Sequence, residues 1–347
     1  METTYCLLCG KTANLVHADY TGYQQPQTFR IYTCPSCGTN FSMPRTDASR
    51  LYDVIYLQRE NHPGYARYWK YAKDVKNIID PLDYLAKSEP TYFGVIDFLN
   101  RKKISKSLKI LEVGSGLGYL TYALRRTGYT ANAIELSKVA VEEAIHNFGN
   151  YYTNTDLFEY SEKNQSSFDV VISTEVLEHV ENPIKFIQAM LDLLKPNGYL
   201  VLTTPNKSFF PKEMIWESSL PPIHFWWFSE ESMKYIAALL GVSIEFLSFK
   251  KYFLKRTLSR NKEYCIKRPL PHAVIDINGN IIVKDKCCTD GTRDSSANLH
   301  IKSIVKMIAK KIIGDGLLNK IYLYVRFKKT HIFAGKRCHY MCAIFKK

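Results

Sequence analysis

The sequence lacks long apolar runs. No stretch of the 347 residues reaches the roughly 18 uninterrupted apolar residues of a membrane-spanning helix. The first residues, METTYCLLCGK, lack the basic start and the apolar core of a secretory signal. We therefore expect a cytoplasmic protein. Hydrophobic residues form 46% of the chain, which suffices for an ordinary globular core, and the length predicts about two domains.

Acidic residues are scarce in the C-terminal part of the chain. Residues 250–347 contain 23 Lys and Arg against 6 Asp and Glu, a net charge of +17, whereas residues 1–249 carry a net charge of −3. Such a basic segment is either a solvated surface that aids solubility or a site for anions. The anions that fit the second interpretation are nucleotide-sugar phosphates, acidic lipid headgroups and nucleic acid. Both interpretations remain open from composition alone.

The chain has nine cysteines, an odd number, so they cannot all form disulfides within the chain. Without an export signal, this number favours thiols and metal ligands over disulfides. Four cysteines form two Cys-x2-Cys-Gly motifs, CLLCG and CPSCG, with 24 residues between Cys9 and Cys34. Two such turns direct four thiolates at one ion and leave no open position. The sequence thus predicts a structural zinc site with the ligands Cys6, Cys9, Cys34 and Cys37.

The alternatives to a zinc site are four unrelated cysteines or a redox-active pair. A redox pair is disfavoured because neither motif has the strand-then-helix context that such a pair needs. The segment TFRIYTC between the motifs alternates like a strand, so residues 1–50 are predicted to form a zinc ribbon. The ribbon has few basic residues, among them Lys11, Arg30 and Arg45, and we do not infer that it binds nucleic acid.

Residues 51–107 have a helical and strongly aromatic pattern. Tyr65, Tyr68, Trp69 and Tyr71 lie close together, and Pro81 begins a new segment. A stripe of this kind usually packs in a core. The alternative is a lid over a flat cofactor, so the segment is predicted to be a helical linker or lid.

A glycine-rich turn follows the helical segment. SLKILEVGSGLGYLTYALRRTGY predicts a buried strand over 109–113, a turn, and a helix over 119–126. Gly114, Gly116 and Gly118 allow a sharp turn and let a ligand lie against bare backbone. A glycine turn alone is a weak signal, so its surroundings decide its meaning.

The surroundings alternate between strand and helix. Four stretches have strand patterns, with helices between them. They are TANAIELS, the residues just before Asp156, FDVVISTEVLEHV and KPNGYLVLTTPN. This alternation predicts an α/β fold with a mostly parallel sheet, in which ligands sit beyond the carboxyl ends of the strands. Glu135, 21 residues after Gly114, falls at such an end, where an acid accepts hydrogen bonds from ribose.

The glycine spacing distinguishes between nucleotides. A dinucleotide fold has Gly-x-Gly-x-x-Gly and seats a pyrophosphate on the helix N-terminus. Here the turn reads GSGLG and follows Glu112. An acid beside the turn suits a cationic ligand and repels a pyrophosphate. A nicotinamide enzyme is therefore disfavoured.

Four motifs together resemble those of a class I S-adenosylmethionine-dependent methyltransferase. They are EVGSGLG, ELS, TEVLEHVENP and LKPNGYL. The branch resembles ubiquinone-biosynthesis-type O-methyltransferases and the zinc-ribbon methyltransferases of bacterial sugar and polysaccharide pathways. The resemblance covers residues 108–250 and, more loosely, the cysteine region. It implies a Rossmann-like, seven-stranded, mostly parallel sheet with helices on both faces.

The same resemblance implies a set of residues that hold S-adenosylmethionine. Glu112 and the glycines would hold the amino-acid end, Glu135 the ribose, Asp156 with Leu157 the adenine, and Thr174 with Glu175 the sulfonium side. The predicted set is Glu112, Gly114, Ser115, Gly116, Gly118, Tyr119, Glu135, Leu136, Ser137, Asp156, Leu157, Thr174 and Glu175.

Methyl transfer requires alignment of the acceptor and removal of its proton. His224, in a long aromatic and proline-punctuated loop, is predicted either to touch the acceptor or to pack and cap the helix after it. His179 in EVLEHVENP is a second candidate base. For this position the resemblance favours a structural role, in which the side chain packs beneath the cofactor. The loop STEVLEH lacks the Asn/Asp-Pro-Pro-aromatic motif of base N-methyltransferases, which disfavours adenine or cytosine methylation.

The C-terminal region is predicted to be an insertion. SIEFLSFK and RCHYMCAIFKK read as the last two strands, so the core spans 108–252, the basic α+β insertion 253–336 and the final strand 337–347. AVIDINGNIIV predicts a hairpin with an Asn278-Gly279 turn. Residues 299–313 predict an amphipathic basic helix that either covers a core or lies on an anionic membrane.

The sequence thus predicts a methyltransferase that acts on a small-molecule or carbohydrate-linked acceptor at oxygen, with structural Zn²⁺. One alternative is an RNA or protein methyltransferase that uses the basic insertion, although nucleic acid is the less favoured partner. Another is a non-catalytic nucleoside-binding scaffold module. The sequence predicts no oligomeric state.

Overall fold

The computed structural model describes residues 2–209, 220–252, 273–282 and 340–347. The chain divides into two compact units. The first unit comprises Met1–Leu247, Pro269–Val283 and Cys338–Lys347, and it contains all the helices and strands described below.

The N-terminal sheet has five antiparallel strands in the order β1-β2-β3-β4-β10. The first four are β1 (Thr3–Tyr5), β2 (Thr12–Thr21), β3 (Thr28–Thr33) and β4 (Asn40–Met43). The fifth, β10 (Trp226–Trp227), comes from far along the chain and pairs Trp226 with Phe41 and Trp227 with Asn40. The sheet therefore extends the ribbon predicted for residues 1–50 by a strand from the loop that contains His224.

A run of helices links the two sheets, as the sequence predicted for residues 51–107. Pro81 and Pro90 occupy the first positions of two of them, where a fixed φ and a missing N–H favour helix initiation. Asp80 caps the first of these two by accepting a hydrogen bond from Asp83 N–H. The helices are α1 (Ser49–Gln58), the 3-10 turn η1 (Arg59–Asn61), α2 (Ala66–Asp74), α3 (Pro81–Ser88) and α4 (Pro90–Arg101).

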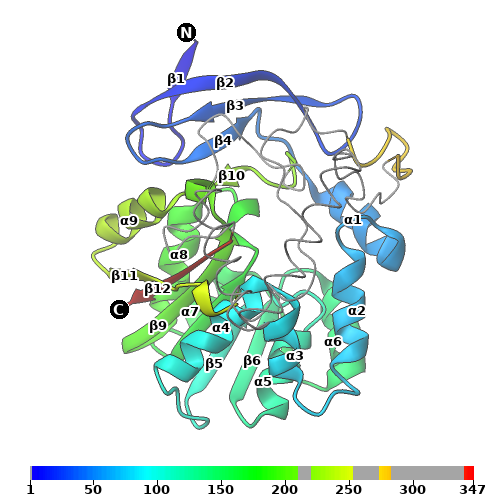
Figure 1. Ribbon diagram of the computed structural model, residues 1–347, viewed down its shortest axis with the longest axis vertical. Helices are drawn as coiled ribbons and strands as arrows, with labels where there is room; N and C mark the ends of the chain where they lie inside the picture. The colour runs from blue at the N-terminus through cyan, green and yellow to red at the C-terminus, as the bar shows by residue number, and fades with distance from the viewer. Residues whose placement is uncertain (1, 210–219, 253–272, 283–339) are drawn as a thin grey trace, which may run out of the picture. The chain divides into compact units, whose positions relative to one another are not determined.

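The second sheet has seven strands in the order β11-β12-β9-β8-β5-β6-β7 (Figure 1). Strands β5 to β9 are parallel, and β12 is antiparallel to both β9 and β11. This confirms the predicted fold class. The strands are β5 (Lys109–Val113), β6 (Thr130–Glu135), β7 (Tyr152–Asn154), β8 (Phe168–Thr174), β9 (Leu194–Pro205), β11 (Ser243–Phe246) and β12 (Tyr340–Lys346).

Helices connect the parallel strands. Because the strand order reverses after β7, right-handed crossovers place the first two helices on one face and the next two on the other. The order switches between β5 and β8, which is where such sheets bind ligands. The connecting elements are α5 (Tyr119–Arg126), α6 (Lys138–Phe148), α7 (Leu157–Lys163), η2 (Leu177–His179), α8 (Pro183–Asp192), η3 (Lys207–Phe209) and α9 (Glu230–Leu239).

The last two strands of the sheet are β11, which ends at Phe246, and β12, which begins at Tyr340; the insertion predicted between them stays a prediction. The predicted hairpin has an antiparallel bridge between Ile275 and Ile281, with Gly279 in the left-handed region at φ 84°. The predicted basic helix over 299–313 lies outside the described residues. Within the described residues, no helix has the length and apolarity needed to cross a membrane.

One hydrophobic core runs through the ribbon and the main sheet. Its buried members include Cys37 and Phe41 of the ribbon, Trp226 of β10, and Ile236 of α9, together with residues of β5, β8 and β9. Burial of large side chains of this type contributes about 1.5–3 kcal/mol each. The ribbon is therefore packed as part of the same core as the sheet that carries the predicted cofactor turn.

Candidate functional site

The glycine turn after β5 has three residues in the left-handed region. Gly114 and Gly118 have φ values of 76° and 79°, and an added Cβ would lie 2.5 Å from Val176 and 2.6 Å from Tyr152. Gly116, at φ 51°, would place a Cβ in open space, with no atom within 4 Å. Two glycines are thus required by packing, while Gly116 leaves bare backbone facing an opening, as a ligand against the turn would need.

Glu135 ends β6 and joins this turn to the next helix. Its Oε2 accepts a hydrogen bond from Gly116 N–H at 2.9 Å, and its Oε1 accepts one from Ser137 N–H at 2.8 Å. Ser137 in turn caps α6 by accepting from Ala140 N–H. Leu136, between them, is 71% exposed. The predicted ribose acid therefore lies at the turn, with an apolar side chain free beside it.

Glu112 is buried in β5, directly before the turn. Thr121 of α5 donates a hydrogen bond to its Oε2. Burial raises the pKa of Glu112 to about 8, and this outweighs the hydrogen bonds that lower it. The carboxyl group is accordingly protonated at neutral pH unless a cation approaches it.

Four further predicted positions cap a helix or are buried in the fold. Asp156 caps α7, because its Oδ1 accepts from Phe158 N–H at 2.7 Å and from Glu159 N–H at 3.3 Å. The Leu157 side chain is buried in the core, 5% exposed. Ser115 has a buried Oγ without a hydrogen-bond partner among the described residues. Tyr119 is also buried, and its hydroxyl pairs with that of Tyr92.

Glu175 lies just beyond Thr174 at the end of β8, in a strained backbone conformation. Its φ of 55° is in the left-handed region, which costs a non-glycine residue about 1–3 kcal/mol. Its carboxylate accepts a hydrogen bond from Thr91 of α4 at 3.3 Å. Burial and the neighbouring Glu178 keep its pKa well above the usual value. Strain of this kind, at a switch-point strand end, is typical of a functional site.

The two predicted histidines, 45 positions apart in sequence, lie against each other. Their ring centroids are 4.5 Å apart in an edge-to-face arrangement. His179 Nδ1 is 2.6 Å from the carbonyl oxygen of Ile223, so Nδ1–H donates to that oxygen and Nε2 keeps its lone pair. His224 Nδ1 is buried without a hydrogen-bond partner among the described residues. Burial lowers the pKa of both rings, that of His179 to about 4.

Glu178 completes this cluster. Its Oε2 accepts from Thr204 at 3.0 Å, while its Oε1 has no hydrogen-bond partner among the described residues and lies 4.0 Å from His179 Nε2. Burial raises the pKa of Glu178 to about 7. Donor atoms of Glu178, His179 and His224 lie within 4.8 Å of one another. The three groups are able to accept a proton or to hold a cation.

Sequence reasoning missed two members of the site, Glu178, which lies within the quoted motif TEVLEHVENP, and Tyr52. Tyr52 of α1 places its hydroxyl 3.0 Å from His179 Nδ1. No motif marks this position, because Tyr52 is one aromatic residue among many in the predicted helical segment. The contact does show that this segment reaches the cluster beyond the strand ends, which favours the lid interpretation for α1.

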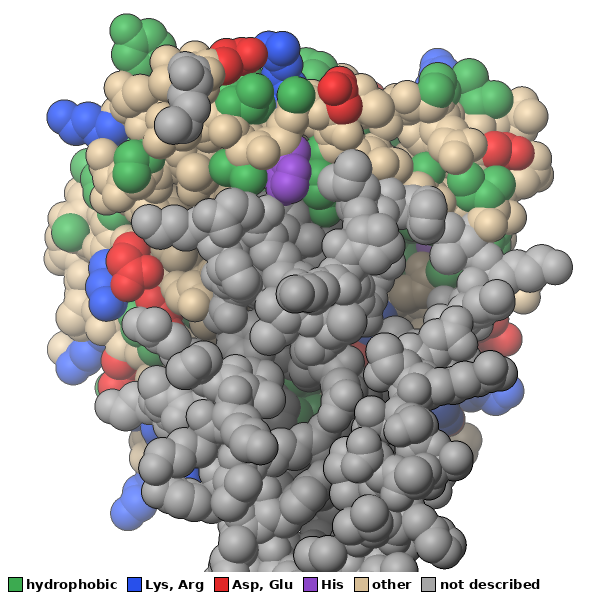
Figure 2. All heavy atoms as spheres, turned by 45° about the horizontal axis from the view of Figure 1, so that its top comes forward, with side chains coloured by type: hydrophobic (Ala, Val, Ile, Leu, Met, Phe, Trp, Pro, Cys, Tyr) green, Lys and Arg blue, Asp and Glu red, His purple; other side chains and the backbone are tan. Residues whose placement is uncertain are grey.

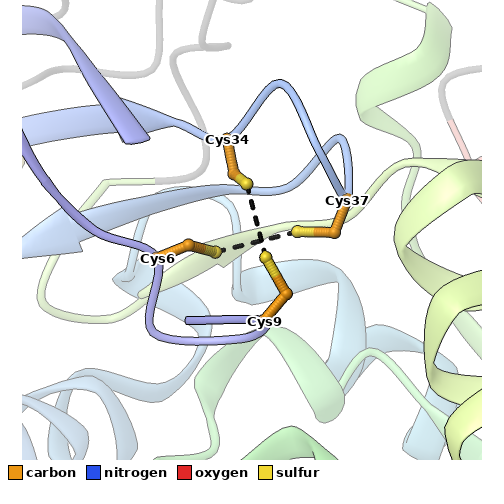
Figure 3. Close-up of side chains that lie close together, drawn as sticks. All are labelled: Cys6, Cys9, Cys34 and Cys37. Atoms are coloured by element: carbon orange, nitrogen blue, oxygen red, sulfur yellow. Dashed lines mark hydrogen bonds between the residues drawn. The ribbon is translucent and has the colours of Figure 1, made fainter. Parts of the chain in front are cut away.

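The four ribbon cysteines converge (Figure 3). Cys6 Sγ is 3.7 Å from Cys37 Sγ, and Cys9 Sγ is 3.5 Å from Cys34 Sγ. A tetrahedron of thiolates about 2.3 Å from zinc has S–S edges of about 3.8 Å, so both distances fit. Gly10 and Gly38 close the two turns by donating to the carbonyls of Cys6 and Cys34, at 2.9 Å each.

Surface charge is mixed on the described part of the molecule that Figure 2 shows. Basic and acidic side chains are interspersed there among polar and apolar ones. This agrees with the net charge of −3 over residues 1–249. This face therefore lacks, among the described residues, the one-sign patch expected of a nucleic-acid interface.

A family model described as a methyltransferase domain matches residues 56–245, more than half of the chain. The ubiquinone biosynthesis O-methyltransferase of Rickettsia typhi is 36% identical over 115 residues, which cover 32% of this chain and 46% of that protein. The mitochondrial enzyme of the same name from Schizosaccharomyces pombe is 34% identical over 110 residues, covering 30% and 40%. The chain thus spans about half the length of the curated relatives it matches.

Solved structures of similar proteins include an S-adenosylmethionine-dependent methyltransferase from Archaeoglobus fulgidus. It is 16% identical, with a TM-score of 0.42, over 73% of this chain and 93% of that one. A sarcosine dimethylglycine methyltransferase described for Galdieria sulphuraria is 13% identical, with a TM-score of 0.39, over 74% and 84%.

Proposed function

Because the chain belongs to the methyltransferase domain family and has the class I fold, we propose that it transfers a methyl group from S-adenosylmethionine to an oxygen atom of a small-molecule or carbohydrate-linked acceptor. The observation that carries the proposal is the turn at Gly116, which is open and bordered by the carboxylate of Glu135. The relatives named for O-methylation support oxygen as the target atom.

When bound, S-adenosylmethionine supplies a methyl group made electrophilic by a sulfonium. In this proposal Glu112 and the turn receive its amino-acid end, and Glu135 accepts hydrogen bonds from the ribose. Leu136, being exposed, packs on the adenine, with the backbone at Asp156 beside it. Thr174 and Glu175 line the sulfonium side, where the cation of the cofactor favours the ionised form of Glu175.

The remaining task is removal of the acceptor proton. We assign it to His224, whose Nδ1 has no hydrogen-bond partner among the described residues and, in the tautomer protonated at Nε2, offers a lone pair. Its low pKa keeps the ring neutral at physiological pH, so it is ready to accept a proton. Glu178, within 4.8 Å, stabilises the imidazolium that forms, and His179 supports the ring edge-on.

Replacement of Glu135 by alanine tests cofactor binding. We expect an affinity for S-adenosylmethionine about 30-fold lower, because hydrogen bonds to a charged carboxylate contribute about 1.5–3 kcal/mol. Glu142→Ala is the matched control, since Glu142 is an exposed residue of α6 that forms an ion pair with Lys138. Isothermal titration calorimetry measures both. Equal affinity of Glu135→Ala and wild type would remove Glu135 from the site, and no binding by wild type would favour the non-catalytic scaffold.

Binding of the cofactor is also expected to release a proton through Glu112. The free carboxyl has a pKa of about 8 and is mostly protonated at pH 7. The ammonium of the cofactor lowers this pKa, since an opposite charge favours the ionised form, and up to one proton leaves. Calorimetry at pH 7 in two buffers of different ionisation enthalpy measures the release. Glu112→Gln should release none, and equal release by the two proteins would contradict the assignment.

An RNA or protein acceptor is the alternative favoured by the charge of residues 250–347. Binding of this type weakens steeply with salt, because counterions are released from the polyanion. Salt-dependent binding of an RNA oligonucleotide to the full chain would therefore support this alternative over a small-molecule acceptor.

A further inference from the structure

Arg45 carries a charge that the proposed chemistry does not use. It follows β4, and its guanidinium carbon lies 4.5 Å from the Phe225 ring and 4.3 Å from the Trp226 ring. Its Nη1 and Nη2 are both buried and have no hydrogen-bond partner among the described residues. Two stacked rings fix the guanidinium plane, while its two terminal nitrogens remain unsatisfied.

The pairing of β4 with the 225–227 segment holds Arg45 against the two residues that follow the predicted base in the chain. Phe225 and Trp226 directly follow His224, and Ser42 N–H donates to Phe225 O at 3.0 Å. Phe225 N–H in turn donates to Glu178 O at 3.0 Å, and Trp226 Nε1–H donates to Val180 O at 2.8 Å. The rings that hold Arg45 are therefore tied through the backbone to the Glu178–His179 turn.

A buried cation without a partner is costly, and proteins normally pair such a group. Burial lowers the pKa of Arg45 to about 10, and the negative charge of Glu181 raises it in part. The guanidinium therefore remains charged at neutral pH. Guanidinium presents parallel N–H donors that match the two oxygens of a carboxylate or a phosphate. An oxyanion is thus the chemical class of ligand that would satisfy both nitrogens.

We propose that Arg45 is the binding group of an oxyanion site beside the His224 loop, and that the methyl acceptor carries the carboxylate or phosphate that completes it. The proposal rests on the proposed function only in identifying the ligand as the acceptor. The oxyanion site itself stands on the geometry of Arg45, Phe225 and Trp226.

The test titrates the full chain with sodium phosphate and with sodium acetate at constant ionic strength, adjusted with sodium chloride. Thermal unfolding reports binding, because a ligand that binds the folded state raises Tm in a saturable manner. We compare wild type with Arg45→Met, which keeps an unbranched apolar stem, and with Arg45→Lys, which keeps the charge but loses the bidentate fork. Arg30→Met is the control, since Arg30 is an exposed ribbon residue paired with Glu2.

We expect wild type and Arg30→Met to respond to at least one anion, and the stronger response identifies phosphate or carboxylate as the group recognised. Arg45→Met should lose at least 10-fold in anion affinity, and Arg45→Lys should retain part of the response, while the affinity of both for S-adenosylmethionine is unchanged. An equal response of Arg45→Met and wild type, or no response of wild type to either anion, would overturn the proposal. Absence of S-adenosylmethionine binding by the wild-type protein would instead overturn the proposed function.

Discussion

Replacement of Cys37 by serine is expected to abolish zinc binding and, with it, methyl transfer. A structural zinc site contributes folding free energy directly, about 10–16 kcal/mol in isolated zinc-finger peptides, and a serine hydroxyl is a poor substitute for a thiolate. Cys37 is buried in the core that the ribbon shares with the main sheet. We therefore expect the loss to extend beyond the ribbon.

The route from Cys37 to the predicted base is short. Cys37 precedes β4, whose Asn40 and Phe41 pair with Trp227 and Trp226 of β10. His224 lies two residues before β10, so a disordered ribbon releases the segment that positions it. The expected result is a chain without bound zinc, with a Tm lower by many degrees and without measurable turnover.

Zinc content by elemental analysis, thermal unfolding by circular dichroism and release of S-adenosylhomocysteine measure these three effects. Cys342→Ser is the matched control, because Cys342 is a buried free cysteine in β12, outside the ribbon cluster. That variant should retain one zinc ion per chain. A Cys37→Ser protein with one bound zinc and the Tm of wild type would show that the four sulfurs are not a structural zinc site.

Replacement of His224 by alanine is expected to lower kcat about 100-fold and to leave the affinity for S-adenosylmethionine unchanged. General base catalysis contributes about 10²–10⁴-fold, and the lower figure applies where water or His179 takes over part of the role. The ring of His224 contacts His179, while the cofactor turn lies beyond β5 and β6. The substitution therefore removes a proton acceptor without removing a predicted cofactor contact.

The measurement uses methyl-labelled S-adenosylmethionine with a panel of phenolic and sugar-nucleotide acceptors. His146→Ala is the control, since His146 is an exposed residue of α6 and should leave kcat unchanged. The conservative His224→Gln variant keeps a polar side chain of similar length but has no basic nitrogen, so it should be as slow as the alanine variant. Recovery of the wild-type rate by glutamine would assign His224 a packing role instead.

Local pattern was sufficient for the architecture and for the four-cysteine cluster. The alternation of strands and helices from 109 to 205, the glycine turn and the paired Cys-x2-Cys motifs depend on spacing within a few residues of each other. Turn geometry and periodicity act over that range, so the sheet, its crossover helices and the convergence of four cysteines were predictable.

Side-chain roles at the strand ends were only partly predictable. Asp156 and Ser137 satisfy helix N-termini, a role that a carboxylate or hydroxyl fulfils wherever free N–H groups lie close by. Leu157 faces the core because α7 packs on the sheet at that point. Sequence spacing marks the end of a strand, but which way each side chain turns there depends on the elements packed around it.

By itself, the sequence determined the fold class, the order of strand and helix, and a four-cysteine cluster, because these depend on local periodicity and on turns of a few residues. Only the tertiary structure decided that β10 completes the ribbon sheet, that His179 and His224 touch, that Tyr52 contacts His179, and that Arg45 stacks on the Trp226 ring. These contacts join residues from 45 to 187 positions apart. They arise because two sheets and a helical segment pack around one core. Spacing within a few residues does not predict which distant residues this packing brings into contact.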